Sequence, residues 1–169
     1  MTRRRARLAL IVLSAAAAAC SAPSSPDRET EGTSGTLVPD AARLLVDITN
    51  TERKAAGLTT LRVSARLMRA AQMHAEQMAG AGRLAHTLPE DRYPRMQDRL
   101  AAVEYRWQAA AENVAAGQPS AAAVVMAWMQ SAGHRANILN ARFTEIGTGS
   151  TRDATGRPYY VQVLARPRP

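Results

Sequence analysis

Residues 112–140, with the sequence E-N-V-A-A-G-Q-P-S-A-A-A-V-V-M-A-W-M-Q-S-A-G-H-R-A-N-I-L-N, decide the fold of this chain. Glu112 and Asn113 fall in a short extended segment that the pattern predicts over residues 105–115. A helix that begins after Pro119 and is apolar all round follows, which is typical of a buried helix. The stretch therefore attaches a few polar groups to elements that pack into a core.

The helix in this stretch is expected to stop at residues 132–133, which places His134 just beyond a helix end. Further elements are predicted on either side of it from hydrophobic periodicity and turn residues. They are a helix between Asp40 and Gly57, a second over 64–78, a short third over 94–102, and strands over 143–151 and 158–165 joined by a turn at 153–156. Helices in the first part and an antiparallel hairpin at the C-terminus indicate an α+β fold built in layers.

The N-terminus has the pattern of an export signal. Four arginines precede an apolar run over residues 8–19, and this pattern predicts a signal peptide over residues 1–19 that is too short for a stable membrane span. Cys20 follows three alanines, as in the cleavage site of a bacterial lipoprotein, so we expect Cys20 to be lipidated and to anchor the protein to a membrane. Ordinary cleavage and secretion is the alternative. Both place the protein outside the cytoplasm, and the single cysteine excludes an internal disulfide.

The formal charge of +8 does not indicate nucleic-acid binding. Half of this charge lies in the four arginines of the predicted signal peptide, and the other arginines are dispersed among acids without a basic cluster. Residues 20–36 contain mainly Ser, Pro, Thr, Gly and charged residues, and we expect a flexible linker there. Residues 37–169 are enough for one domain with one core.

Two of the three histidines differ in their surroundings. His74 lies on the apolar face of the helix over 64–78, where a histidine is usually a core residue that is hydrogen-bonded to the backbone. His86 lies in a loop-rich region over 80–106, and loops that are positioned by a scaffold often carry site residues. His86 is therefore the better candidate for a functional site.

From Asn50 to Val163 the chain resembles the CAP superfamily, also called SCP-like, which includes cysteine-rich secretory proteins and pathogenesis-related proteins. Six segments match in the family's order. They are N-T-E-R with A-G-L-T-T-L, L-M-R-A-A-Q-M-H-A-E-Q-M, L-A-H-T, A-E-N-V-A-A-G, W-M-Q-S-A-G-H-R-A-N-I-L, and F-T-E-I-G-T-G with Y-Y-V-Q-V. The version without disulfides resembles the bacterial branch. The resemblance implies a three-layered α-β-α sandwich.

The resemblance also implies a cleft site. Members of the family typically gather two histidines and two glutamates there, and His86, Glu112 and His134 occupy three of these positions. The fourth position falls on Ser131, so the set is incomplete. Glu145 is a candidate for the second carboxylate, although its spacing alone does not show that it points inward.

Three interpretations of these side chains follow from their chemistry. Two imidazoles can hold a divalent cation such as zinc, with Glu112 as a third ligand or as a base for bound water. Alternatively, a buried Glu-His pair can tie helices to a sheet without any ligand. Ser131 beside His134 has no orienting acid or oxyanion hole that the sequence identifies, which argues against a nucleophile.

Two functions remain as hypotheses, because a fold does not fix a function. In the first, the domain is an extracytoplasmic binding module that takes up a small hydrophobic or envelope ligand, whether lipid, glycan or peptide. In the second, it is a metal-assisted hydrolase of cell-envelope material, with His86 and His134 on the metal and Glu112 as the base. The missing fourth carboxylate favours the binding module.

Overall fold

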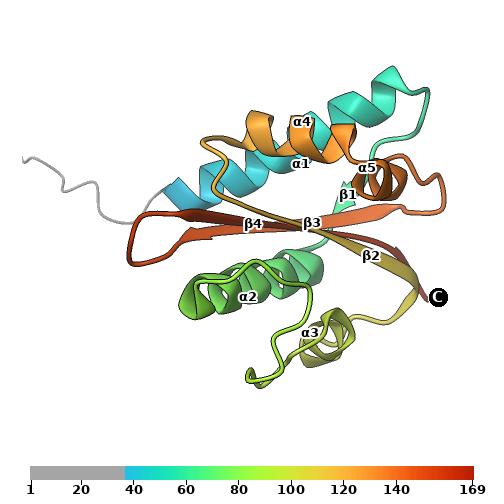
Figure 1. Cartoon of the computed structure of the whole chain (residues 1–169). Coiled ribbons are helices and arrows are strands. Elements are labelled where there is room, and N and C mark those ends of the chain that lie inside the picture. Colours follow the sequence, from blue (N-terminus) through green and yellow to red (C-terminus); the bar gives the residue numbers. More distant parts are fainter. Residues whose placement is uncertain (1–36) are drawn as a thin grey trace, which may run out of the picture. The chain divides into compact units, whose positions relative to one another are not determined.

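The computed structural model describes residues 37–169, and side chains from residue 41 onward. A four-stranded sheet lies between two layers of helices (Figure 1). One layer consists of α1 (Leu37–Ala55), α4 (Ala121–Gln130) and α5 (Ala132–Ile138), and the other of α2 (Ala65–Ala81) and α3 (Met96–Ala102). This architecture confirms the α-β-α sandwich that the resemblance implied.

The sheet has the strand order β1-β3-β4-β2, so β2 lies at one edge. Strands β3 and β4 form the predicted C-terminal hairpin, and β2 extends the sheet by pairing antiparallel with β4. A two-residue strand, β1, pairs parallel with β3 and was not predicted. The bounds are Arg62–Val63 for β1, Trp107–Ala116 for β2, Glu145–Arg152 for β3 and Pro158–Pro167 for β4.

The hairpin turn forms as its residues predicted. Asp153 Oδ1 accepts hydrogen bonds from the backbone N–H groups of Thr155 and Arg157, at 2.8 and 3.0 Å. Gly156 follows with a φ of 84°, a left-handed conformation that glycine adopts without steric cost. This turn sets the register of β3 against β4.

The two faces of the sheet bury two separate hydrophobic cores. Along β4, Tyr159, Val161 and Val163 pack with the buried side of α2. Tyr160 and Leu164 point to the opposite face and pack with the core of α1, α4 and α5. The alternation is the two-residue period of a strand.

Helix α2 lies unusually close to β3. A Cβ atom at Gly147 would lie 2.1 Å from the backbone carbon of Leu67, and one at Gly149 would lie 2.4 Å from the backbone nitrogen of Gln72. Neither position has room for a side chain. The absence of a Cβ therefore brings α2 onto the sheet and fixes where its residues lie over the strands.

Several helix bounds differ from the prediction. Helix α1 begins at Leu37, three residues before the predicted start at Asp40. Helix α4 ends at Gln130, and α5 begins again after one extended residue, so His134 lies inside a helix rather than beyond one. The sequence predicts that Ala132-Gly133 ends a helix, but both residues lie in the first turn of α5. A glycine inside a helix costs only about 1 kcal/mol, which the helix tolerates.

The prediction that α4 is buried all round is also wrong. Its Met126 is 59% exposed, whereas Trp128 is 2% exposed and donates a hydrogen bond to the carbonyl of Val114. Helix α4 covers one face of the sheet and leaves its other side to solvent. Methionine is apolar, but one exposed apolar residue is normal on a protein surface.

The predictions for the signal peptide over 1–19, the lipidated Cys20 and the linker over 20–36 lie outside the described residues. Within residues 37–169, no helix is long and apolar enough to cross a bilayer.

Candidate functional site

Glu112 is the centre of a buried polar cluster. It lies on β2, on the face of the sheet that α2 and α3 cover, and it is 9% exposed. Its Oε1 accepts a 3.0 Å hydrogen bond from Nδ1 of His86, and its Oε2 accepts a 2.7 Å hydrogen bond from Nη2 of Arg99. Each carboxylate oxygen therefore accepts one hydrogen bond from a protein donor.

Arg99 is the member of this cluster that the sequence analysis missed. It lies on α3, is 1% exposed, and also donates from Nη1 to the carbonyl of Pro94 at 3.1 Å. The available signal was its position, because Arg99 stands three residues after Met96 and four before Val103, which puts it on the apolar side of its helix. An arginine there needs a buried partner, and Glu112 is that partner.

His74 holds the loop that carries His86. It is fully buried, and its Nε2–H donates a 2.8 Å hydrogen bond to the carbonyl of Ala85. This confirms the prediction of a core histidine that is bonded to the backbone. The same nitrogen lies 3.6 Å from Glu112 Oε1, which places His74 beside the cluster as well.

His134 reaches the site from the other face of the sheet. Asn113 follows Glu112 on β2 and points to the opposite face, where its Nδ2 donates to the carbonyl of His134 at 3.2 Å. Asn137, one turn further along α5, donates to Asn113 Oδ1 at 2.9 Å. Because β2 is an edge strand, α5 and the loop of His86 can approach each other around it.

The two imidazoles influence each other's charge state. Burial lowers the pKa of His134, and the charge of His86 lowers this pKa further. The pKa of His86 is raised, chiefly by its hydrogen bond to Glu112, although burial opposes the shift. Protonation of one imidazole therefore disfavours protonation of the other.

Glu112 stays ionised despite its burial. Burial alone would raise its pKa, but the hydrogen bond from His86 and the positive charges of His74 and Arg99 outweigh that effect and lower the pKa. A buried carboxylate with a lowered pKa is a weak proton acceptor. It is well suited to hold His86 in one orientation.

The structure does not bring Ser131 and Glu145 into this cluster. Ser131 is the extended residue between α4 and α5, and its side chain makes no capping hydrogen bond there. Glu145 opens β3 and bonds to Arg62 and to the hydroxyl of Tyr105, with Oε2 2.8 Å from the Tyr105 oxygen. It lies in a separate pocket and does not act as a second carboxylate beside Glu112.

The donors left for a metal ion are few. Within residues 37–169, no group of three or more His, Cys, Asp and Glu side chains is arranged to hold one. Since Glu112 is committed to His86 and Arg99, the free donors are Nε2 of His86 and the ring of His134. The side chain of His86 is 58% exposed, so its free nitrogen is accessible to solvent.

Comparison with known sequences gives one family and two bacterial relatives. The profile of the CAP family, the cysteine-rich secretory protein family, matches residues 46–164. The uncharacterized protein YkwD of Bacillus subtilis is 37% identical over 105 residues, which are 62% of this chain and 40% of YkwD. The uncharacterized membrane protein YlbC of the same species is 31% identical over 118 residues, which are 70% of this chain and 32% of YlbC. The chain thus spans well under half the length of either relative.

Solved structures share the fold. An extracellular protein with an SCP domain from Bacillus anthracis superposes with a TM-score of 0.69 at 27% identity, over 86% of this chain and 45% of that protein. An outer surface protein from Borrelia burgdorferi also gives a TM-score of 0.69, at 19% identity, over 76% of this chain and 94% of that protein. The second likeness concerns the fold alone.

Proposed function

Because this chain belongs to the CAP family of cysteine-rich secretory proteins, we propose that it is an exported, membrane-anchored binding module that acts outside the cytoplasm. The Arg-rich start, the apolar run and Cys20 support export and anchoring. The similarity to an extracellular protein of Bacillus anthracis agrees with that location. The ligand is a lipid, a glycan or a peptide of the cell envelope.

One observation carries the choice of binding over catalysis: the Glu112 side chain is only 4% exposed while both of its oxygens accept hydrogen bonds from His86 and Arg99. A general base needs a lone pair within reach of the proton that it removes. The lone pairs that Glu112 has left are shielded from solvent, so it is poorly placed to activate a water. Its position instead fixes the tautomer of His86, with the proton on Nδ1 and the lone pair on the exposed Nε2.

A divalent cation such as zinc is part of this proposal. His86 and His134 would hold it, and a carboxylate that orients a ligating histidine is a common companion of metal sites. Two protein ligands leave coordination positions for water or for an oxygen of the ligand. Such a cation would supply a positive charge that recognises ligand oxygens. The nearby charge of Arg99 and the raised pKa of His86 predict weak binding that improves as pH rises.

Calorimetric titration of the full chain with zinc chloride, before and after treatment with a chelator, tests the cation site. His86→Ala and His134→Ala are expected to lose zinc binding, whereas Arg135→Ala, an exposed neighbour of His134 on α5, should keep it. Loss of zinc affinity in all three variants, or in none, would contradict a site built from the two imidazoles. Circular dichroism of each variant shows whether the fold is kept.

Incubation with purified cell-wall sacculi and with lipid vesicles distinguishes a binding module from a hydrolase. Co-sedimentation with one of these materials, without release of soluble fragments, is the expected result. Zinc-dependent release of fragments that Glu112→Gln abolishes would instead establish the metal-assisted hydrolase.

The anchor is tested separately by partition into detergent. The full chain expressed in a bacterium is expected to partition into the detergent phase and to carry a lipid on Cys20 by mass spectrometry. Cys20→Ser should appear in the aqueous phase. A wild-type protein that is aqueous and starts at another residue would show secretion without an anchor.

A further inference from the structure

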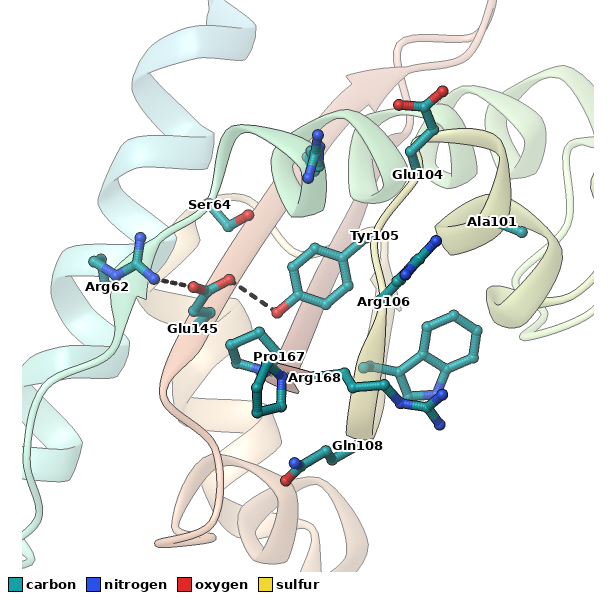
Figure 2. A pocket seen from close by; sticks show the side chains of 13 residues that line it. Arg62, Ser64, Ala101, Glu104, Tyr105, Arg106, Gln108, Glu145, Pro167 and Arg168 are labelled. Carbon is teal, nitrogen blue, oxygen red and sulfur yellow. Dashed lines mark hydrogen bonds and ion pairs between the residues drawn. The ribbon is translucent and has the colours of Figure 1, made fainter.

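A pocket opens at the end of the sheet, and no histidine lines it. It has a volume of about 1220 Å³ and lies where β1, β2 and β3 begin and β4 ends (Figure 2). Trp107 at the start of β2 lines it, and Glu112 lies five residues further along this strand, a distance of roughly 15 Å. The proposed binding function of His86 and His134 does not involve this pocket.

A buried acid forms one wall of the pocket. Glu145 is 5% exposed and lies between Arg62 and the hydroxyl of Tyr105, and it bonds to both (Figure 2). Burial, together with the hydrogen bond to Glu145, raises the pKa of Tyr105, so this hydroxyl remains a neutral donor. Since Tyr105 is neutral, the charges at this wall are those of the Arg62–Glu145 ion pair, and they compensate each other.

Three further arginines line the pocket without such compensation. Arg66, Arg106 and Arg168 are exposed, and none of them forms an ion pair with another residue of the described chain. Glu104 is the one remaining acidic side chain among the lining residues. The uncompensated arginines therefore outnumber the acids, and the pocket carries an excess of positive charge.

We propose that this pocket binds the phosphate group of a small phosphate ester. A phosphate monoester carries a charge of about −1.5 to −2 near neutral pH, so an excess of positive charge attracts it more strongly than a single carboxylate. Guanidinium groups present paired N–H donors that fit phosphate oxygens. Arg66 also stands in the first turn of α2, where the helix dipole favours an anion.

The size and lining of the pocket select an ester over inorganic phosphate. Trp107 and Pro167 provide apolar surface beside the arginines. Sites for whole small molecules measure about 300–1,000 Å³, so a pocket of about 1220 Å³ has room for an entire ester. A bare phosphate ion would fill only part of it. The phosphate therefore binds the arginines while an organic group rests on the indole and the proline. The ester can come from a soluble metabolite or from a lipid headgroup.

Calorimetric titration of the full chain with glycerol 3-phosphate at physiological salt tests the proposal. Arg66→Gln/Arg106→Gln is expected to weaken binding at least tenfold, because each charge-assisted hydrogen bond to an ion contributes about a factor of ten or more. Arg69→Gln/Arg142→Gln removes the same charge from exposed residues outside the pocket and should change affinity less than twofold. Quenching of Trp107 fluorescence, absent in Trp107→Phe, provides a second measurement of occupancy.

Equal losses in the two double variants would overturn the proposal, because they would show attraction to the overall charge. No binding by the wild type at millimolar glycerol 3-phosphate would overturn it too. Vesicles that contain phosphatidic acid separate the two sources. Vesicle binding that glycerol 3-phosphate displaces identifies a lipid headgroup, and binding of the free ester without vesicle binding identifies a soluble ester. His86→Ala and His134→Ala should leave both measurements unchanged, so failure here is distinguishable from failure of the cation site.

Discussion

Arg99 on α3 and Glu112 on β2 form a 2.7 Å ion pair in which the side chains are only 1% and 4% exposed. The pair joins a short helix to the edge strand of the sheet and holds the acid that orients His86. Forming a buried ion pair requires costly desolvation of both charges, so such a pair is not in itself a large source of stability. Removing one partner is costly, because the other charge is left buried.

Replacing Arg99 with Met should destabilise the protein by about 3 kcal/mol, since Glu112 would lose its buried counter-charge. Urea denaturation measures this change. Arg83→Met is the matched control, because Arg83 and Glu90 form an ion pair with both side chains more than half exposed, and such pairs contribute about 0–1 kcal/mol. Similar losses in the two variants would contradict the role assigned to Arg99.

The stability of the metal-free protein should depend on pH through His86. Its pKa is raised in the folded state by the hydrogen bond to Glu112, so its contribution is present in full below its unfolded pKa of about 6.5 and is lost as pH rises through the folded pKa. The difference in free energy of unfolding between wild type and His86→Gln should therefore shrink as pH rises. Urea denaturation over a pH series in the presence of a chelator measures it.

NMR titration provides the control for this pH effect. The His86 ring should titrate above the ordinary histidine pKa and the His134 ring below it. Glu112→Gln should lower the pKa of His86. A His86 ring that titrates at the same pH in wild type and Glu112→Gln would rule out the hydrogen bond as the cause.

Alanine at Gly147 or Gly149 should be severely destabilising. The new Cβ would lie within 2.5 Å of the α2 backbone in each case, and backbone cannot move aside as a flexible side chain can. We expect a loss of at least about 3 kcal/mol, at the upper end of overpacking effects. Gly80→Ala is the control, because nothing lies within 4 Å of its Cβ position, and helix propensity predicts a gain of about 0.5–1 kcal/mol. Thermal unfolding of the three variants measures their stabilities and should rank Gly80→Ala above the other two.

Asn113→Ala should destabilise the protein by about 2–3 kcal/mol, because it leaves the carbonyl of His134 and the side chains of Asn137 and Gln162 without their partner. NMR spectra should show a displaced His134 ring and an unchanged His86 pKa, since Glu112 points to the other face. A changed pKa of His86 together with unchanged NMR signals of the His134 ring would contradict the separation of the two faces by β2.

Much of the fold was predictable because it depends on local patterns. Local patterns predicted the two strands of the hairpin, and Asp153 and Gly156 predicted the turn between them. The two-residue β1 has no local pattern to detect, since it exists only through its pairing with β3. Helix α5 was not predicted, because one extended residue, Ser131, separates it from α4 without a proline.

The hydrophobic period and the turn residues were enough to predict a layered fold, because both are local properties of the sequence. The ordered motifs indicated the family and, through it, the candidates His86, Glu112 and His134. Tertiary structure alone decided what these side chains contact. In the folded protein, Arg99 bonds to Glu112, and Glu145 bonds to Arg62 and Tyr105 in a separate pocket. His134 lies on the other face of the sheet, beside the edge strand β2. Burial and the pairing of charges depend on which elements pack together, and that depends on contacts between residues far apart in sequence.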